Sequence, residues 1–168
     1  MHGYKGFISD VENAFQWLVN DYSPKISKTV DSSFGEYAIE IRLKKCIILF
    51  DLDRMDLQGK FINPVSGKQY HITSVLELLK VEGIKFPSSM EKVNQIRALL
   101  EEYSRVVKLY LKDVLNGDFS WTRAYEENEE RERSLVAKVW KLPYNNPIKQ
   151  KFWSGDSSWK DDIKDLNK

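Results

Sequence analysis

The sequence predicts one α+β domain over residues 1–168, in which an antiparallel meander of four or five strands packs against an N-terminal helix and a long C-terminal helix pair. Apolar residues recur at helical spacing before residue 22 and again after residue 90. Between these segments, apolar and polar residues alternate, as in strands with one wet face. The polar breaks between the strands are too short for the crossovers that parallel strands require.

The first helix is expected at about 9–22. The sequence "SDVE" at its start has the pattern of a capping box, in which the side chains of Ser9 and Glu12 would each bond the other's backbone amide. Pro24 would end the helix, because proline cannot continue it. Its apolar stripe contains Val11, Ala14, Phe15, Leu18 and Val19.

Five strands are expected near residues 26–33, 36–44, 46–54, 59–64 and 69–72. In "GEYAIEIRLKK" apolar and polar residues alternate, and the next stretch, "CIILFDLDRMDL", is more apolar. Because side chains alternate across a strand, we expect Ile48, Phe50 and Leu52 to face the core while Asp51 and Asp53 lie on the other face.

The second half of the chain is expected to be helical. A short helix begins at Thr73 or Ser74 and ends at Gly83, and a long helix runs over about 90–116. A further helix over about 120–141 has a wholly polar middle, "YEENEERERS", which is typical of a solvated face with many ion pairs. Residues 143–168 are expected to form an irregular, aromatic-rich tail, part of which docks onto the rest of the chain.

The apolar periodicities together predict a hydrophobic core. Its members are Phe15, Leu18, Ile39, Ile41, Ile48, Phe50, Leu52, Ile96, Leu99, Leu100, Tyr103 and Val107.

The amino-acid composition argues against several classes of function. Lys and Arg (26) nearly cancel Asp and Glu (25), so the chain has no overall field to attract nucleic acid, and we do not expect a nucleic-acid partner. Cys46 is the only cysteine, which excludes an internal disulfide and favours a small core residue. With only His2 and His71, we expect no cofactor, no metal site and no histidine-based catalysis.

The expected compartment is the cytoplasm. The first residues lack the basic-then-apolar layout of a secretory signal, and no apolar run approaches the roughly 18 residues of a membrane span. We therefore expect no membrane association, while the oligomeric state stays open.

The stretch "FDLD" at residues 50–53 resembles the first motif of the haloacid-dehalogenase-like phosphotransferases. The resemblance implies that Asp51 would attack phosphorus and that Asp53 would act as general acid–base. In the tail, "GDSSWKDD" resembles the magnesium-binding motif of that family through Asp156, Asp161 and Asp162. A magnesium-dependent phosphoester hydrolase is therefore the alternative function.

Three departures from that family favour an ordinary strand end instead. Arg54 and Met55 stand where the family has a glycine and a threonine, residues 73–142 contain no strand to build a parallel sheet, and "KQKFW" is a poor buried strand. Arg54 would neutralise one of the carboxylates, as in a surface ion pair worth about 0–1 kcal/mol. We therefore expect no catalytic residue and no enzyme.

Two other patterns carry weaker alternatives. The sequence Glu40-Ile41-Arg42 approaches a metal-dependent nuclease motif, but arginine cannot serve as its general base. The tail "NNPIKQKFWSGDSSWK" interleaves lysines with aromatics, which is the chemistry that stacks bases and contacts phosphates. With aspartates close by, we expect this tail to pack against the protein, and an accessory nucleic-acid domain is the third candidate.

The order of elements over about 7–121 resembles small bacterial proteins that include immunity proteins of polymorphic toxin systems. The resemblance rests on an amphipathic helix, a strand meander ending in "FDLDRMD", a short "SVLELL" helix and a long helix closed by "VLNGDFS". It implies a cytoplasmic protein without a catalytic centre that blocks a cognate toxin, and it carries over no site residue.

We therefore predict a non-enzymatic protein-binding domain, most concretely an immunity-type inhibitor of a bacterial toxin. An acidic patch would block a basic partner through electrostatic steering and a few buried anchors. The candidate partner-binding residues are Asp51, Asp53, Asp56, Glu126, Glu127, Glu129 and Glu130.

Overall fold

The computed structural model describes residues 4–31, 36–84 and 91–166. Contacts divide the chain into two compact units, where the sequence suggests a single domain. Unit 1 ends at Ser120 and unit 2 begins at Trp121. The expected last residues of the first strand and the expected start of the long helix lie outside the described residues.

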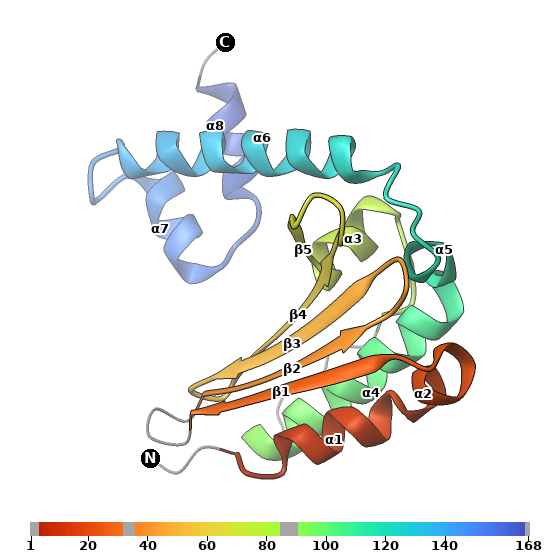
Figure 1. The fold of residues 1–168 in the computed structure, drawn as a ribbon. Helices are drawn as coiled ribbons and strands as arrows, with labels where there is room; N and C mark the ends of the chain where they lie inside the picture. Colours follow the sequence, from red (N-terminus) through yellow and green to blue (C-terminus); the bar gives the residue numbers. More distant parts are fainter. Residues whose placement is uncertain (1–3, 32–35, 85–90, 167–168) are drawn as a thin grey trace. The chain divides into compact units, whose positions relative to one another are not determined.

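Unit 1 contains a five-stranded antiparallel sheet with the order β1-β2-β3-β4-β5, so each strand pairs with its neighbours in sequence (Figure 1). This confirms the predicted α+β class and the meander. The strands are β1 (Lys25–Asp31), β2 (Glu36–Arg42), β3 (Ile47–Asp53), β4 (Asp56–Ile62) and β5 (Gln69–His71).

Helices α1 (Phe7–Ala14), α2 (Gln16–Tyr22) and α4 (Lys92–Tyr110) line one face of the sheet. The core forms between them: the Phe50 ring lies 4.8 Å from that of Phe15 and 6.1 Å from that of Tyr103, measured between ring centroids. All the predicted core residues are buried except Leu99, which is half-buried. The alternation of the strands therefore identified the buried face correctly.

The first helix differs from the prediction in two ways. The chain is helical from Phe7 but breaks at Phe15, whose φ of −106° and ψ of 18° separate α1 from α2. The capping box does not form, because Ser9 lies inside the first turn and its hydroxyl donates to the Gly6 carbonyl at 2.9 Å. Phe15, at the break, and Leu18 are both buried in the core, as the helical stripe predicted.

The long helix is also divided. Leu111 is fully buried and ends α4, and the short helix α5 (Lys112–Leu115) follows it. Helix α3 (Ile72–Leu78) starts directly after β5 and packs against β4 and β5. It begins one or two residues before the expected cap and ends before Gly83.

Gly59 on β4 lies close to side chains of β3 and α3. It pairs with Phe50 across the sheet, and a Cβ atom at this position would lie 2.9 Å from Phe50 Cε1 and 3.0 Å from Ile72 Cδ1. Real Cβ atoms essentially never come that close to another heavy atom. Glycine is therefore required here by packing, because it leaves room for the Phe50 ring.

Unit 2 consists of helices α6 (Thr122–Trp140), α7 (Pro147–Ser154) and α8 (Trp159–Asp165). The tail over 143–168, expected to be irregular, thus contains two helices. Asn146 starts α7 by accepting a hydrogen bond from the Ile148 amide at 2.9 Å, and proline fits the first helical position. The three helices share a cluster of Leu135, Val139, Ile148, Trp159 and Ile163.

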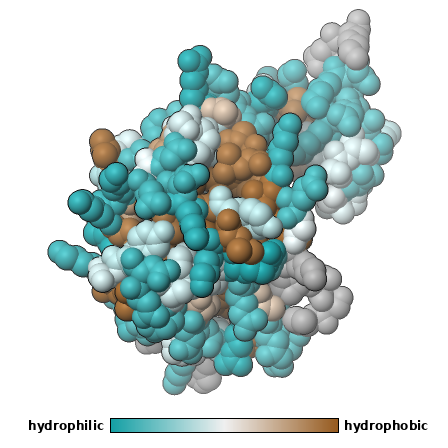
Figure 2. Space-filling model, turned by 90° about the vertical axis from the view of Figure 1, so that its right-hand side faces the viewer, coloured by the Kyte–Doolittle hydropathy of each residue, from teal (hydrophilic) through white to brown (hydrophobic). Residues whose placement is uncertain are grey.

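Apolar side chains also reach the surface. Leu109 near the end of α4 is 59% exposed and Tyr110 is 50% exposed. Seen from the side of α2 and α5, apolar patches lie among hydrophilic side chains (Figure 2). In the described part of the chain, no helix combines the length and the apolar character needed to cross a bilayer.

Candidate protein-binding site

The face of the sheet that points away from α1 and α4, here called the outer face, is mostly polar. Strand register places Glu40, Leu49, Lys60 and His71 in one row across β2 to β5. The alternation that buries Phe50 directs Asp51 and Asp53 to this outer face, as predicted.

Carboxylates gather where β2 begins and β3 turns into β4. Asp53 pairs directly with Asp56, and Glu36 lies one residue beyond the Tyr37–Leu52 pair, on the side of Asp53. We call Glu36, Asp51, Asp53 and Asp56 the acidic end of the sheet. Three of the predicted partner-binding residues therefore lie together in unit 1.

A tight turn with an unusual backbone holds the β3–β4 hairpin closed. Both loop residues have positive φ, 48° at Arg54 and 71° at Met55, as in a two-residue hairpin of type I′. That conformation favours asparagine and glycine, and a residue with a Cβ atom loses about 1–2 kcal/mol in it. The turn therefore brings Asp53 and Asp56 directly opposite each other, although neither of its two residues is a glycine.

The two aspartates of the "FDLD" motif have different surroundings. Asp51 is 27% exposed and accepts a hydrogen bond from Lys60 Nζ at 2.9 Å, from the neighbouring strand. Asp53 is 55% exposed, and its ion pair with Arg54 at 3.3 Å joins two solvated groups. Arg54 thus pairs with one of the carboxylates, as expected, whereas Lys60 was not foreseen as the partner of Asp51.

A hollow of about 300 Å³ lies against the acidic end of the sheet. Its outer-face lining comes from Thr29, Glu36, Ala38, Asp51 and Asp53. Ala38 sits between Thr29 and Asp51 in the sheet register, and its short side chain leaves the space open. The hollow therefore has an apolar floor and three carboxylates at its rim.

The opposite end of the sheet carries the opposite charge. Lys44 and Lys45 follow β2 and line a second hollow of about 270 Å³ together with Asn63, Gly117 and Phe119. Positive charge at one end and negative charge at the other make the sheet electrostatically polar, although the whole chain has a formal charge of only +1.

The other predicted residues lie in unit 2, on α6. Glu126, Glu127, Glu129 and Glu130 are all exposed. Glu127 pairs with Arg123 at 2.9 Å and Glu130 with Arg133 at 3.4 Å, so this helix has the ion-paired, solvated face that its sequence predicted. Arginines on the same helix thus offset part of this negative charge, as Lys60 and Arg54 offset part of it at the acidic end of the sheet.

Sequence reasoning missed Glu36. It is the first residue of β2, and only the hairpin register shows that it comes level with Asp53. The signal was available in principle, since two antiparallel strands joined by a short turn bring the start of one level with the end of the other.

The buried titratable groups agree with the sequence interpretation. Cys46 is fully buried, and burial raises the pKa of its thiol to about 12. Burial, with a smaller contribution from the Asp56 charge, raises the pKa of the Tyr103 phenol to about 12. Cys46 is therefore a core residue with an unreactive thiol, as its apolar neighbours in sequence indicated.

The scaffold that the phosphotransferase resemblance implied is absent, because the sheet is antiparallel throughout. Asp51 and Asp53 belong to unit 1, whereas Asp156, Asp161 and Asp162 belong to unit 2. Among the described residues, no group of three or more His, Cys, Asp or Glu side chains is arranged to hold a metal ion.

Comparison with protein-family models, with curated proteins and with solved structures finds no match to this chain.

Proposed function

We propose that this chain is a non-enzymatic protein-binding domain that captures a basic protein at the acidic end of the sheet. The observation that carries the proposal is the hollow of about 300 Å³ whose rim holds Glu36, Asp51 and Asp53. Its apolar floor suits the methylene stem of a lysine or arginine, and the carboxylates suit the charged head.

The surroundings of the two aspartates support a division of roles. Lys60 holds Asp51 in place, so this carboxylate is ordered before a partner arrives. Asp53 and Glu36 are more exposed and can attract a cationic side chain from solution. Ordered groups lower the entropic cost of binding, while exposed charges accelerate association.

The most concrete form of the proposal is an immunity-type inhibitor of a bacterial toxin. A toxin that acts on nucleic acid needs a basic surface to hold its substrate, and an acidic protein bound there would exclude that substrate. The plan-level resemblance over residues 7–121 supports the same class, because it covers the whole sheet of unit 1.

The test is isothermal titration calorimetry against the purified products of the genes on either side of this one, among which we expect a basic toxin. The double variant Glu36→Lys/Asp53→Lys should bind at least about tenfold more weakly, because both rim charges then repel a basic partner. Asp113→Lys, an exposed carboxylate on α5, is the control and should bind like the unaltered protein. Equal affinity of the double variant and the control would refute the acidic end as the binding site.

The hydrolase alternative can be examined on the same protein samples. If purified protein with magnesium hydrolyses a generic phosphoester and Asp51→Asn abolishes that turnover, the non-enzymatic assignment is wrong. Turnover that survives Asp51→Asn would show that Asp51 is not the nucleophile.

A further inference from the structure

Unit 2 carries a second surface, of opposite charge, that the proposed function does not use. Between Ser134 and Gly155 there are four lysines and no aspartate or glutamate, whereas the segments on both sides are rich in acids. The lysines are Lys138, Lys141, Lys149 and Lys151. Charge in unit 2 is therefore segregated, even though the formal charge of the whole chain is +1.

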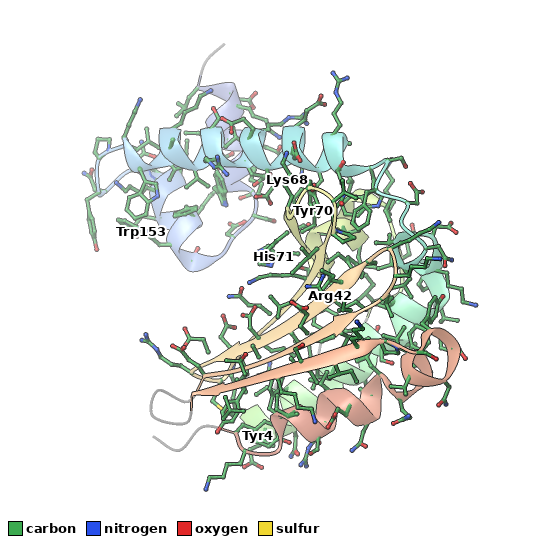
Figure 3. All side chains as sticks on the ribbon, viewed as in Figure 1. Tyr4, Arg42, Lys68, Tyr70, His71 and Trp153 are labelled. Carbon is green, nitrogen blue, oxygen red and sulfur yellow. The ribbon has the colours of Figure 1, made fainter. Side chains whose placement is uncertain are left out.

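Exposed aromatic rings accompany these lysines. Trp140 ends α6 and is 58% exposed, Tyr144 lies in the loop before α7 and is 77% exposed, and Trp153 on α7 is 40% exposed. The Tyr144 and Trp153 rings lie 4.6 Å apart between centroids (Trp153 is labelled in Figure 3). We call Trp140, Tyr144 and Trp153 the aromatic platform.

Lys149 holds this platform together. Its side chain is buried, and its ammonium donates to the backbone carbonyls of Trp140 at 3.1 Å and Leu142 at 2.9 Å. The same ammonium lies 5.5 Å from the centre of the Trp140 ring and 5.4 Å from that of Trp153. One cation thus ties the end of α6 to α7 and fixes two exposed tryptophans before any ligand arrives.

The loop that carries Tyr144 is fixed as well. The Gln150 side-chain amide donates to the Tyr144 carbonyl at 2.9 Å, and Asn146 caps the start of α7. Rings that are both exposed and held in place are a favourable binding surface, because little side-chain entropy remains to be lost.

The positive charge beside the platform is only partly neutralised. Lys151 pairs with Asp162 at 2.6 Å. Neither Lys138 nor Lys141, both exposed, forms an ion pair with a carboxylate in the described part of the chain. Two ammonium groups near the end of α6 therefore remain available to an anion.

We propose that the aromatic platform binds single-stranded nucleic acid, with bases stacking on Tyr144 and Trp153 and a phosphate contacting Lys141, the residue that follows Trp140. Stackable rings beside unpaired cations are the features that such sites combine. A duplex keeps its bases stacked inside and has no base face to offer these rings, so a single strand fits better. The near-zero charge of the whole chain excludes a long-range field but not this local cluster.

The experiment measures binding of a fluorescein-labelled oligo(dT) and an oligo(U) of twelve nucleotides by anisotropy, together with quenching of tryptophan emission. The full-length protein should bind both, with quenching. Tyr144→Ala and Trp153→Ala should each weaken binding by about tenfold, because stacking of a base contributes on the order of 1–3 kcal/mol. Trp153→Phe keeps a stacking ring and should restore most of the affinity.

Salt dependence tests the phosphate contacts separately. Lys141→Gln should reduce the slope of log affinity against log salt by about 0.7, the value expected for one lost single-strand phosphate contact. Tyr110→Ala and Lys112→Gln, exposed positions in unit 1, are matched controls and should leave affinity and slope unchanged.

Three results would overturn the proposal: no binding by the full-length protein, binding that Tyr144→Ala does not weaken, or equal affinity for a duplex or for heparin. Tyr144 is 77% exposed, so its truncation should leave the thermal unfolding of the protein unchanged, which separates loss of binding from loss of fold. The proposed toxin binding uses a different unit of the chain, so either proposal can fail without the other.

Discussion

The close approach at Gly59 gives a quantitative test of the core. In Gly59→Ala the new methyl group would lie 2.9 Å from the Phe50 ring and 3.0 Å from Ile72, inside the 3.4–4 Å of ordinary contact. Neither neighbour is a solvated side chain that can move away, since both are fully buried. Overpacking of this kind costs about 1–3 kcal/mol.

A smaller opposing effect reduces that cost. Alanine loses less backbone entropy than glycine on folding, which favours the variant by about 0.5–1 kcal/mol, and Gly59 does not have the positive φ that would penalise alanine. The net expectation for Gly59→Ala is a loss of about 0.5–2 kcal/mol in the free energy of unfolding. Urea denaturation followed by circular dichroism measures it, with the midpoint shifted and the slope unchanged.

A double-mutant cycle identifies the cause. Phe50→Leu removes the ring carbon that the new methyl group would meet, so the double variant Gly59→Ala/Phe50→Leu should lose less stability than the sum of the single losses, by about 0.5 kcal/mol or more. Phe7 is also fully buried, and its ring makes an edge-to-face contact with Tyr37 instead. Gly59→Ala/Phe7→Leu should therefore be additive. Additivity in both cycles, or a fully stable Gly59→Ala, would refute the packing argument.

Three further predictions follow from the turn, unit 2 and the buried thiol. Met55→Gly should raise the free energy of unfolding by about 0.5–1 kcal/mol, because glycine tolerates the positive φ; an unchanged urea midpoint would contradict the strained turn. Lys149→Met should lower the free energy of unfolding by about 1–3 kcal/mol, because two backbone carbonyls lose their hydrogen-bond donor. Hydrogen exchange at the end of α6 should then accelerate, and unchanged exchange there would contradict a stabilising role of Lys149 at this helix end. Between pH 9 and 12 the unfolded chain loses the Cys46 proton that the folded chain keeps, so this thiol should lower stability with rising pH by up to about 1.4 kcal/mol per unit. Cys46→Ala should reduce the dependence and leave the part that Tyr103 contributes above pH 10; urea curves at pH 8 and pH 10.5 with parallel shifts in both proteins would disprove it.

The sheet could be predicted from sequence because its central strands alternate. "EYAIEIR" buries every second residue, and "IILFDLD" does so from Ile48 onward although Ile47 is buried as well, and the short turns between the strands allow only antiparallel neighbours. The same alternation placed Asp51 and Asp53 on the outer face. In these strands the local alternation of apolar and polar residues agrees with the place of the strand in the fold, and such segments can be predicted from sequence.

Helix breaks were not predictable in this way. Phe15 and Leu111 are apolar, continue the helical stripe in sequence and are buried, as they would be in an uninterrupted helix. Neither position is a glycine or a proline, so no local residue signals the breaks.

The neighbours of Asp51 and Asp53 could be predicted from sequence only in part. Lys60 pairs with Asp51 through the register of β3 and β4, and Glu36 comes level with Asp53 through the register of β2 and β3. The tail was expected to be irregular because its helices are short, and short helices gain their stability from packing instead of from intrinsic preference. Local start signals stood at Asn146 and Pro147, before α7, and at Ser158, which has the capping-box spacing to Asp161.

The order of strands in unit 1 bears on how rapidly the protein acquires its structure. Since β1 to β5 pair strictly with their sequence neighbours, each hairpin closes a loop of a few residues, and the chain need not search for distant partners. Sheets usually form slowly, but here each strand can pair with a neighbour that has already formed, starting from β3. We therefore expect the sheet to assemble within milliseconds, ahead of the docking of α4, which comes from much later in the chain.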